Sequence, residues 1–446
     1  MSKIIKLKKG LDLRLVGEAE KVLDKLPMSE NYAVCPTDFE GVTPKLLVKV
    51  GDKVKAGTPL FFNKYNQEVL FSSPVSGEVS AINRGEKRKV LSVVVKADAV
   101  QEYESFEIKP LASCSSEDVK SVLLSAGLWP LIIQRPYGII ADPKDTPKAI
   151  FISGFDSAPL APDMEFVMAD QLDDLRKGLD VMAKLTAGKV HLSLNAEAQG
   201  KLNTIENAEK HLFQGPHPAG NVGVQIHHID PIAKGEMVWT VGIQDLAIIG
   251  RLFNTGKVNM TKVVALTGGE AEKPRYVQAI VGAPVADIVG AEKAEVRIIN
   301  GNVLTGKTVA YDGALGFYNN QITMISDNSE YEMLGWAKPV RSKRFSVSKS
   351  YFSWLCPNKR YNLDTHINGG PRAFVVTGLY EQYLPMDIYP LYLLKAILAE
   401  DIDKMENLGI YEVVEEDLAL CEFVDPSKSE MQEIIRRGIN LMIKEN

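Results

Sequence analysis

A strand, helix and strand pattern between residues 149 and 194 constrains the fold of this chain more than any other feature. Residues 149–153 form a short apolar run that Gly154 stops, as a buried strand would. An amphipathic helix follows, and residues 189–194 then alternate between apolar and polar side chains. Because a crossover helix places its two strands side by side in the same direction, the pattern predicts a parallel βαβ unit.

The carboxyl edge of this unit lacks the chemistry that holds a phosphate. Ligands of such units bind beyond the carboxyl ends of the strands. Here that edge begins with Phe155, Asp156 and Ser157, and no glycine-rich loop follows to let a phosphate approach the backbone. The sequence therefore predicts a nucleotide-type fold element without nucleotide-type binding chemistry.

Length and charge place the chain among ordinary soluble domains. With 446 residues we expect roughly three domains. A net charge of −6 argues against general nucleic-acid binding. The longest apolar runs, such as residues 128–133, are far shorter than the ~18 residues of a membrane helix, and the lysine-rich start resembles no signal peptide. We therefore expect any association with a membrane to be peripheral.

The cysteines and histidines show no metal-ligand spacing. The four cysteines are scattered, which predicts a reduced, cytosolic protein without disulfides. His227 and His228 are adjacent, so on a strand they would face opposite sides and could not share an ion. The sequence thus predicts no metal site. His217 stands between two prolines in a rigid segment, where it can present a ring nitrogen to a ligand or simply form a structural turn.

Further modules flank the βαβ unit. Residues 48–79 alternate short strands with glycine turns, which predicts a small β-sandwich similar to the biotinyl/lipoyl hammerhead domains. In those domains a lysine at a hairpin tip is modified, but here Lys64 is expected nearer the strand, and the surrounding motif is missing. Residues 258–299 predict a compact α+β module, and apolar periodicity predicts helices over most of the last hundred residues.

Two segments carry further candidate binding residues. Residues 128–136 form an apolar, proline-bounded loop that contains Arg135, which could hold an anion or a quinone head group, or could reach the surface from a buried turn. Residues 338–354 interleave basic and aromatic side chains, which suits anionic lipid headgroups or an acidic partner, and equally an amphipathic strand.

The order of the modules, together with several short motifs, carries a resemblance to a known family. The motifs are KGLDL at residues 9–13, SPVSG with INRG at 73–77 and 82–85, GPHPAG at 215–220, LGWA with FSV at 334–337 and 345–347, and EDLALC at 416–421. With these the chain resembles, end to end, the A-subunit family of Na+-translocating NADH:quinone reductases. More distantly it is similar to the C subunit of the Rnf complex and to the NADH-binding flavoprotein subunit of respiratory complex I.

The resemblance implies an α/β multidomain fold. Its expected parts are an N-terminal strand and barrel-sandwich hybrid at residues 1–100, a Rossmann-like α/β domain at 101–255, a ubiquitin-like α+β module of the type that binds soluble ligands at 256–335, and a mostly helical domain at 336–446.

The resemblance also implies a role within a larger enzyme. We expect a peripheral subunit on the cytoplasmic face of the bacterial inner membrane, in a six-subunit Na+-pumping complex that reduces ubiquinone or menaquinone. The flavoprotein relatives have a glycine-rich loop and cysteine runs, whereas this chain has the bulky residues 128–136 and a single cysteine, Cys421, in the corresponding segment. One thiolate cannot hold a cluster that needs four ligands. NADH, flavin and iron–sulfur chemistry are therefore expected in partner subunits.

The region that holds flavin in the relatives supplies the candidate site. We predict no catalytic residue in this chain, but a quinone pocket lined by Trp129, Arg135, Phe155, Asp156 and His217. Contacts with the membrane or a partner are expected from Arg341, Lys343, Arg344 and Phe345. The alternatives are a stand-alone flavin- or NADH-dependent oxidoreductase and a purely structural assembly subunit.

Overall fold

A seven-stranded sheet forms the centre of the computed structural model, which describes residues 4–198, 200–327, 333–334, 344–347, 355–374 and 378–445. Across the sheet the order is β1 (Ile4–Lys6), β14 (Glu209–Gln214), β13 (Val190–Asn195), β12 (Ile150–Ser153), β15 (Val238–Val241), β10 (Ile132–Arg135) and β11 (Ile139–Ile140). The first five strands are parallel, and β10 and β11 are antiparallel to their neighbours. The predicted βαβ unit is confirmed, because α3 (Leu172–Met182) connects the parallel strands β12 and β13.

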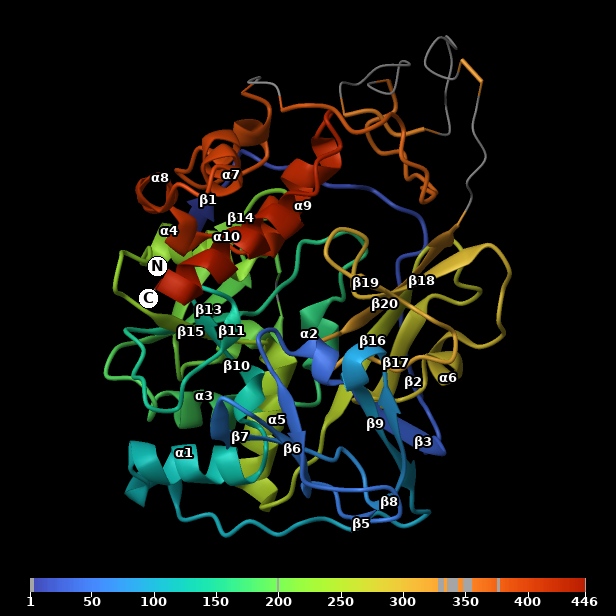
Figure 1. Ribbon diagram of the computed structural model, residues 1–446, viewed down its shortest axis with the longest axis vertical. Helices are drawn as coiled ribbons and strands as arrows, with labels where there is room; N and C mark the ends of the chain where they lie inside the picture. Colours follow the sequence, from blue (N-terminus) through green and yellow to red (C-terminus); the bar gives the residue numbers. More distant parts are fainter. Residues whose placement is uncertain are drawn as a thin grey trace.

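Helices cover both faces of this sheet (Figure 1). Ile150 and Ile152 of β12 join the core that α3 and α5 (Ile243–Thr255) complete, whereas Phe151 joins a second cluster with Ile226 of α4 (Val222–Ile229). Successive side chains of a strand point to opposite faces. The two helix layers are therefore separated by one buried strand, which explains why β12 is apolar at every position but its last.

A six-stranded sheet forms the α+β module. Its order is β19 (Lys307–Val309), β18 (Val296–Asn300), β20 (Gln321–Ser326), β16 (Thr261–Thr267), β17 (Arg275–Ile280) and β2 (Glu20–Lys25), with α6 (Val285–Val289) between β17 and β18. The strands and short helix predicted over residues 258–299 are present. The N-terminal segment contributes β1 to the first sheet and β2 to this one. This segment therefore joins two sheets before the β-sandwich begins.

The β-sandwich lies between these strands and the α/β region in the sequence. It pairs a sheet of β3 (Asn31–Val34), β9 (Val90–Ala97), β8 (Gly77–Arg84) and β5 (Lys53–Val54) with a sheet of β4 (Pro44–Leu46), β6 (Pro59–Asn63) and β7 (Asn66–Ser72). Phe61 stacks on Phe71 in its core, with ring centroids 4.6 Å apart. Lys64 and Tyr65 form the two-residue turn between β6 and β7, so the expectation that Lys64 lies away from the hairpin tip is wrong.

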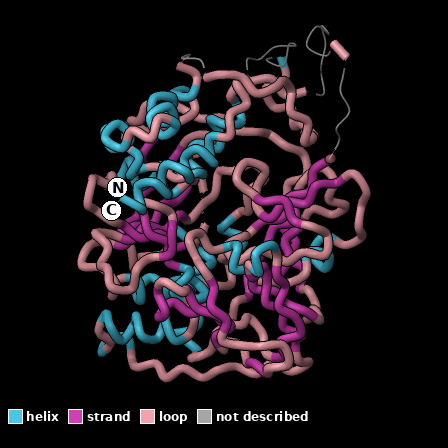
Figure 2. The backbone as a smooth tube through the Cα atoms, viewed as in Figure 1, coloured by secondary structure: helices cyan, strands magenta, loops and turns pink. Residues whose placement is uncertain are grey.

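The C-terminal region is helical, as predicted. It contains α7 (Pro390–Leu398), α8 (Ile402–Asn407), α9 (Glu415–Val424) and α10 (Met431–Glu445), which build their own core and pack beside β1, β14 and α4 (Figure 1). The remaining helices are α1 (Ser116–Ser125) and α2 (Met164–Val167), with 3-10 turns at Pro36–Asp38, Glu86–Arg88, Leu111–Ser113, Trp129–Leu131, Lys201–Thr204, Tyr380–Gln382 and Ile410–Glu412. Figure 2 shows the helices mostly on one side of the molecule and the strands of the sandwich and six-stranded sheet on the other.

No helix in the described part of the chain is both long and apolar enough to cross a lipid bilayer.

Close contact between α3 and α5 gives a first test. A Cβ atom added to Gly250 of α5 would lie 1.7 Å from the backbone oxygen of Asp174 in α3. In a helix, alanine is more favourable than glycine by about 1 kcal/mol, but the clash with the Asp174 backbone oxygen should cost more than this gain. We expect Gly250→Ala to lower the free energy of unfolding by about 1–3 kcal/mol in urea titrations.

The matched control is Gly370→Ala, since no atom lies within 4 Å of the added Cβ there. It should change stability by less than about 0.5 kcal/mol. A neutral or stabilising Gly250→Ala would contradict the close packing of α3 on α5.

Candidate functional site: a cavity at the carboxyl edge of the sheet

A cavity of about 220 Å³ lies where β12 and β15 end. Ser153, Phe155 and Asp156 line it from the segment after β12, and Gly242 lines it from the segment after β15. From β12 the chain crosses to β13 on one side, whereas β15, the neighbour on the other side, is reached only after β14 and α4. Such a reversal of strand order leaves a crevice that ligands of α/β proteins use.

Two helices begin at this cavity. Asn221 and Val222 at the start of α4, and Gly242 and Ile243 at the start of α5, are among its lining residues. The first N–H groups of a helix have no partner within the helix and carry partial positive charge. The cavity therefore favours a ligand with electronegative oxygen atoms.

His217 lines the cavity as a neutral hydrogen-bond donor. The Oγ atom of Ser157 accepts a hydrogen bond from the Gly220 N–H at 2.7 Å and lies 3.0 Å from His217 Nδ1. Nδ1 donates to or accepts from the Ser157 hydroxyl according to the tautomer of the ring, and a neutral imidazole keeps one N–H donor in either case. Burial lowers the pKa of His217 to about 4, so the ring is uncharged at neutral pH.

Two carboxyl groups of the cavity wall hold protons more readily than usual. Asp156 keeps an exposed surface at the cavity, but the surrounding chain desolvates its carboxyl group and raises its pKa. Desolvation also raises the pKa of Glu416 to about 7; the charge of Arg135 opposes this rise, and the smaller effect of Asp417 adds to it. Glu416 can therefore act as a proton donor close to neutral pH, and the carboxyl group of Asp156 holds its proton more readily than a solvated one.

Arg135 holds Glu416 in place instead of facing the cavity. Residues 128–136, predicted as a loop, form a 3-10 turn and β10, and Arg135 is the last residue of that strand. Its guanidinium forms salt bridges with Glu416 and, at 2.9 Å, with Asp417, and the Asp417 side chain is 0% exposed. Because both acids occupy the guanidinium, neither predicted role of Arg135, anion contact or surface exposure, describes its place in the structure.

Trp129 lies in the core and does not line the cavity. Its Nε1–H donates to the backbone oxygen of Ala141 at 2.7 Å, and its ring meets Trp239 edge-on at a centroid distance of 5.5 Å. Of the five predicted residues, Phe155, Asp156 and His217 line the cavity. Arg135 contacts the cavity wall only through Glu416.

Several lining residues were missed by the sequence analysis. Glu416 belongs to the EDLALC motif, which carried the resemblance but suggested no site residue. Asn302, Thr305 and Asn320 reach the cavity from the six-stranded sheet. No periodicity within the βαβ unit could signal these residues, because they come from a separate part of the chain.

The predicted membrane or partner contacts are only partly described. Arg344 pairs with Asp364 at 2.8 Å, and the Phe345 ring lies 5.5 Å from that of Tyr361. Arg341 and Lys343 lie outside the described residues. Arg344 and Phe345 therefore both contact other residues of this chain.

The histidines are arranged differently from the prediction. His227 and His228 lie on helix α4 and not on a strand. His227 pairs with Glu412 at 2.6 Å, and His228 forms a hydrogen bond with the Pro385 backbone oxygen at 2.8 Å. The prediction of no metal site also missed a grouping that forms only in space. His191, Glu209 and His211 bring three potential ligand atoms together.

The domains of this chain, including the one that contains the cavity, match those of a respiratory enzyme. Three family models match in order: the NqrA N-terminal barrel-sandwich hybrid domain at residues 5–98, the NqrA second alpha/beta domain at 114–258 and the NQRA C-terminal domain at 263–310. The first two confirm the barrel-sandwich hybrid and the α/β domain that follows it.

Relatives extend this match to the whole chain. The A subunit of the Na(+)-translocating NADH-quinone reductase of Neisseria meningitidis serogroup A is 39% identical, and the match covers 99% of this chain and 100% of the relative. The serogroup C protein is 40% identical over the same shares, and that of Yersinia pestis bv. Antiqua is 37% identical over 97% of this chain and 98% of its own. The chain therefore belongs to the A-subunit family of the Na+-translocating NADH-quinone reductases, and the predicted resemblance is confirmed.

Among solved structures, an NAD+-reducing [NiFe]-hydrogenase is 11% identical, and the match covers 77% of this chain and 67% of the hydrogenase chain at a TM-score of 0.37.

Removing Arg135 should be costly, because it would leave Asp417 buried without its charge partner. We expect Arg135→Gln to lower the free energy of unfolding by about 3–5 kcal/mol in urea titrations. The control is Arg437→Gln, which removes an exposed ion pair with Glu400 and should cost less than about 1 kcal/mol. Equal, small losses in both variants would contradict the structural role of Arg135.

Acid should destabilise the protein through His217. The pKa of His217 falls from 6.5 to about 4 on folding, so its contribution to stability is complete above pH 6.5 and is lost as the pH falls toward 4. The loss amounts to about 3 kcal/mol. Between pH 7 and 4, His217→Gln should therefore lose about 3 kcal/mol less than the wild type.

His366→Gln, a substitution away from the cavity, should keep the pH dependence of the wild type. If His217→Gln and the wild type lose stability in parallel, the ring is not buried as a neutral group.

Proposed function

We propose that this chain is a peripheral subunit, on the cytoplasmic face, of a membrane-bound Na+-translocating NADH:quinone oxidoreductase, and that its cavity contributes to quinone reduction. One observation carries the proposal. Phe155, the His217 donor and two carboxyl groups of raised pKa, Asp156 and Glu416, surround a single cavity onto which two helix N-termini open. An aromatic surface with a few convergent polar groups is what a quinone ring requires.

The chemistry of quinone reduction matches these groups. A quinone accepts two electrons and two protons, so that each carbonyl oxygen becomes a hydroxyl. The N–H group of the neutral His217 ring and the first N–H groups of α4 and α5 suit the carbonyl oxygens, on which negative charge builds up as electrons arrive. Asp156 and Glu416 suit the delivery of the two protons, and water restores their protons afterwards. The electrons come from partner subunits.

Two features support a chain without its own flavin or iron–sulfur centre. The cavity of about 220 Å³ is below the ~300–1,000 Å³ of typical small-molecule sites, which suits one ring more than a flavin nucleotide. In the part of the chain that the structure describes, no three cysteines lie together. In this proposal NADH, flavins and clusters belong to the other subunits of a six-subunit complex, which reduces ubiquinone or menaquinone.

Docking on the membrane subunits is assigned to the region around residues 333–367. Large apolar side chains are exposed there at Met333, Leu334, Leu355 and Ile367. The basic and aromatic segment at residues 338–354 belongs to the same region of the sequence. Exposed apolar side chains, in a region whose sequence is rich in cations, suit a surface formed by membrane proteins and lipid headgroups.

Blocking the cavity should weaken quinone binding. Thr305 is exposed and lines the cavity, so Thr305→Trp can obstruct it with little effect on the core. In the complex extracted gently from membranes, we expect Thr305→Trp to raise the KM for a short-chain quinone at least about tenfold, about 1.4 kcal/mol. NADH oxidation by an artificial acceptor should stay unchanged, because it needs no quinone site.

Thr308→Trp is the control, since Thr308 is also exposed but does not line the cavity. If both variants keep the wild-type KM while the complex assembles, the chain has only a structural role. A purified chain that is yellow with bound flavin and separates from membrane subunits would instead indicate a stand-alone flavoenzyme.

A further inference from the structure

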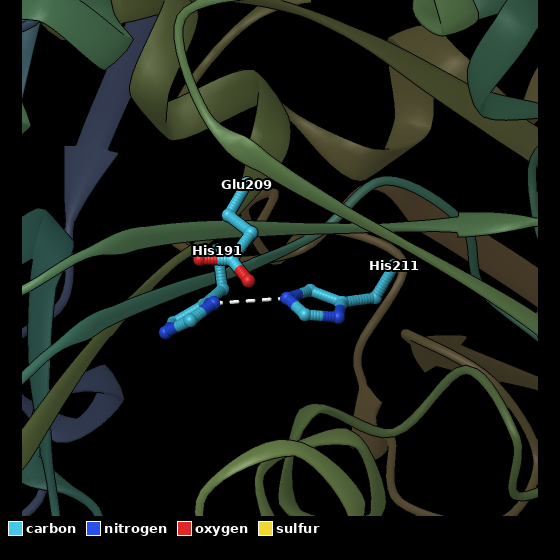
Figure 3. Close-up of side chains that lie close together, drawn as sticks. All are labelled: His191, Glu209 and His211. Carbon is cyan, nitrogen blue, oxygen red and sulfur yellow. Dashed lines mark hydrogen bonds between the residues drawn. The ribbon is translucent and has the colours of Figure 1, made fainter. Parts of the chain in front are cut away.

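Three potential metal ligands lie together at the amino edge of the seven-stranded sheet, the end opposite the cavity (Figure 3). His191 comes from β13, and Glu209 and His211 come from β14. Their ligand atoms all lie within 4.8 Å of one another, and His191 Nδ1 is 2.9 Å from His211 Nε2. Figure 3 shows the Glu209 carboxyl group pointing toward the two imidazole rings.

The pairing of the strands produces this convergence. In the parallel ladder His191 lies opposite Glu209, and Ser193 lies opposite His211. Residues two apart on a strand share a face, so Glu209 and His211 point the same way. His191 shares that face, on which α4 also packs. The three ligands therefore need no loop to bring them together.

The histidine from β13 is already oriented. Its ring stacks on Phe151 with centroids 4.7 Å apart and an angle of 22° between the planes, and only 6% of the residue is exposed. A ligand held by packing loses little conformational freedom when it binds an ion, and such preorganisation favours affinity.

The lysines around the cluster do not prevent a metal ion from binding there. Lys189 pairs with Glu209 at 2.6 Å, but both side chains are exposed, and such a pair contributes only about 0–1 kcal/mol. Two further lysines line the same pocket as the cluster: Lys148 pairs with Asp230 and Glu236 at 2.8 and 2.7 Å, and Lys210 donates to the Asn203 backbone oxygen at 2.9 Å. A divalent ion therefore displaces the hydrogen bond between His191 Nδ1 and His211 Nε2, whose shared proton it releases, and one weak ion pair.

We propose that His191, Glu209 and His211 bind a divalent transition-metal ion, of which Zn2+ best suits two imidazoles and one carboxylate. Zn–N bonds of about 2.0–2.1 Å in a tetrahedral site place two ligand nitrogens about 3.3 Å apart. The present 2.9 Å separation needs to widen by only a few tenths of an ångström. Three protein ligands leave a position open for water or an external ligand.

The open position faces solvent-accessible space. The three ligands line a cavity of about 840 Å³ together with His228 and Asp230 at the end of α4. This cavity is at the amino ends of β13 and β14, so the ion would not touch a ligand bound at the carboxyl ends of β12 and β15. Its direct effect is to connect two adjacent strands, and the site does not depend on the proposed quinone function.

Zinc titration of the purified full chain tests the site. After treatment with EDTA and its removal, isothermal titration with ZnCl2 should show one equivalent bound, and Zn2+ should raise the Tm. Loss of an outer-shell partner alone costs about 10–100-fold in metal affinity, so His191→Asn and His211→Asn should each weaken binding at least about 100-fold. Added Co2+ should develop visible ligand-field absorption in the wild type and not in His211→Asn.

His366→Asn, a substitution outside the cluster, should bind Zn2+ as the wild type does. His211 is only half-buried, so His211→Asn keeps the test valid even if His191→Asn fails to fold; unchanged Tm values in EDTA verify folding. The proposal is overturned if the wild type binds no Zn2+ at millimolar concentration. It is equally overturned if His211→Asn binds as tightly as the wild type, or if the bound equivalent is lost in His366→Asn.

Discussion

The salt bridges of Arg135 with Glu416 and Asp417 join the C-terminal helices to the central sheet, and the cavity depends on them. Taking these charges out of water is costly, and only close pairing offsets that cost. The pairing fixes the first turn of α9 beside the start of α4, where Asn221 Nδ2 donates to the Glu416 backbone oxygen at 3.1 Å. Gly223 permits the approach, since a Cβ there would lie 2.5 Å from Asp417 Oδ1.

The parallel sheet separates two kinds of chemistry at its two ends. Its carboxyl edge combines helix N-termini, a neutral histidine and two carboxyl groups of raised pKa, which together suit an oxygen-bearing ring that gains electrons. Its amino edge combines two imidazoles with a carboxylate, which suits a divalent ion. Helix α4 connects the two ends, because it begins at one cavity and ends at the other.

The N-terminal segment makes the site a product of several domains. It contributes β1 to the seven-stranded sheet and β2 to the six-stranded sheet, and between them Asp12 accepts the backbone N–H of His217 at 2.9 Å. The backbone oxygen of Gly17 accepts a hydrogen bond from the Gly268 N–H. Gly17 has a positive φ of 89°, and a Cβ atom on Gly17 would lie 2.1 Å from the Gly268 oxygen. The N-terminal segment therefore links the two sheets, and residues from both of them line the cavity that a ligand would enter.

The sequence by itself determined the elements and the edge of the sheet that forms the site. Periodicity identified β12, α3 and β13, and the general geometry of parallel strands placed Phe155 and Asp156 at a ligand-binding edge. The Rossmann-like and ubiquitin-like assignments and the domain boundaries stay predictions. Periodicity reports on neighbours within a few residues, because it reflects which side of one element is buried.

Only the tertiary structure decided which distant side chains meet. Arg135 and Glu416 are 281 residues apart in the sequence. No local sequence pattern shows whether these two side chains pair with each other or lie exposed to water. The grouping of His191 with Glu209 and His211 depends on the register of β13 against β14, which a shift of one residue would abolish by turning the side chains to the other face. Long-range pairing and register belong to the folded chain, so the carboxyl group of raised pKa and the three potential metal ligands became visible only there.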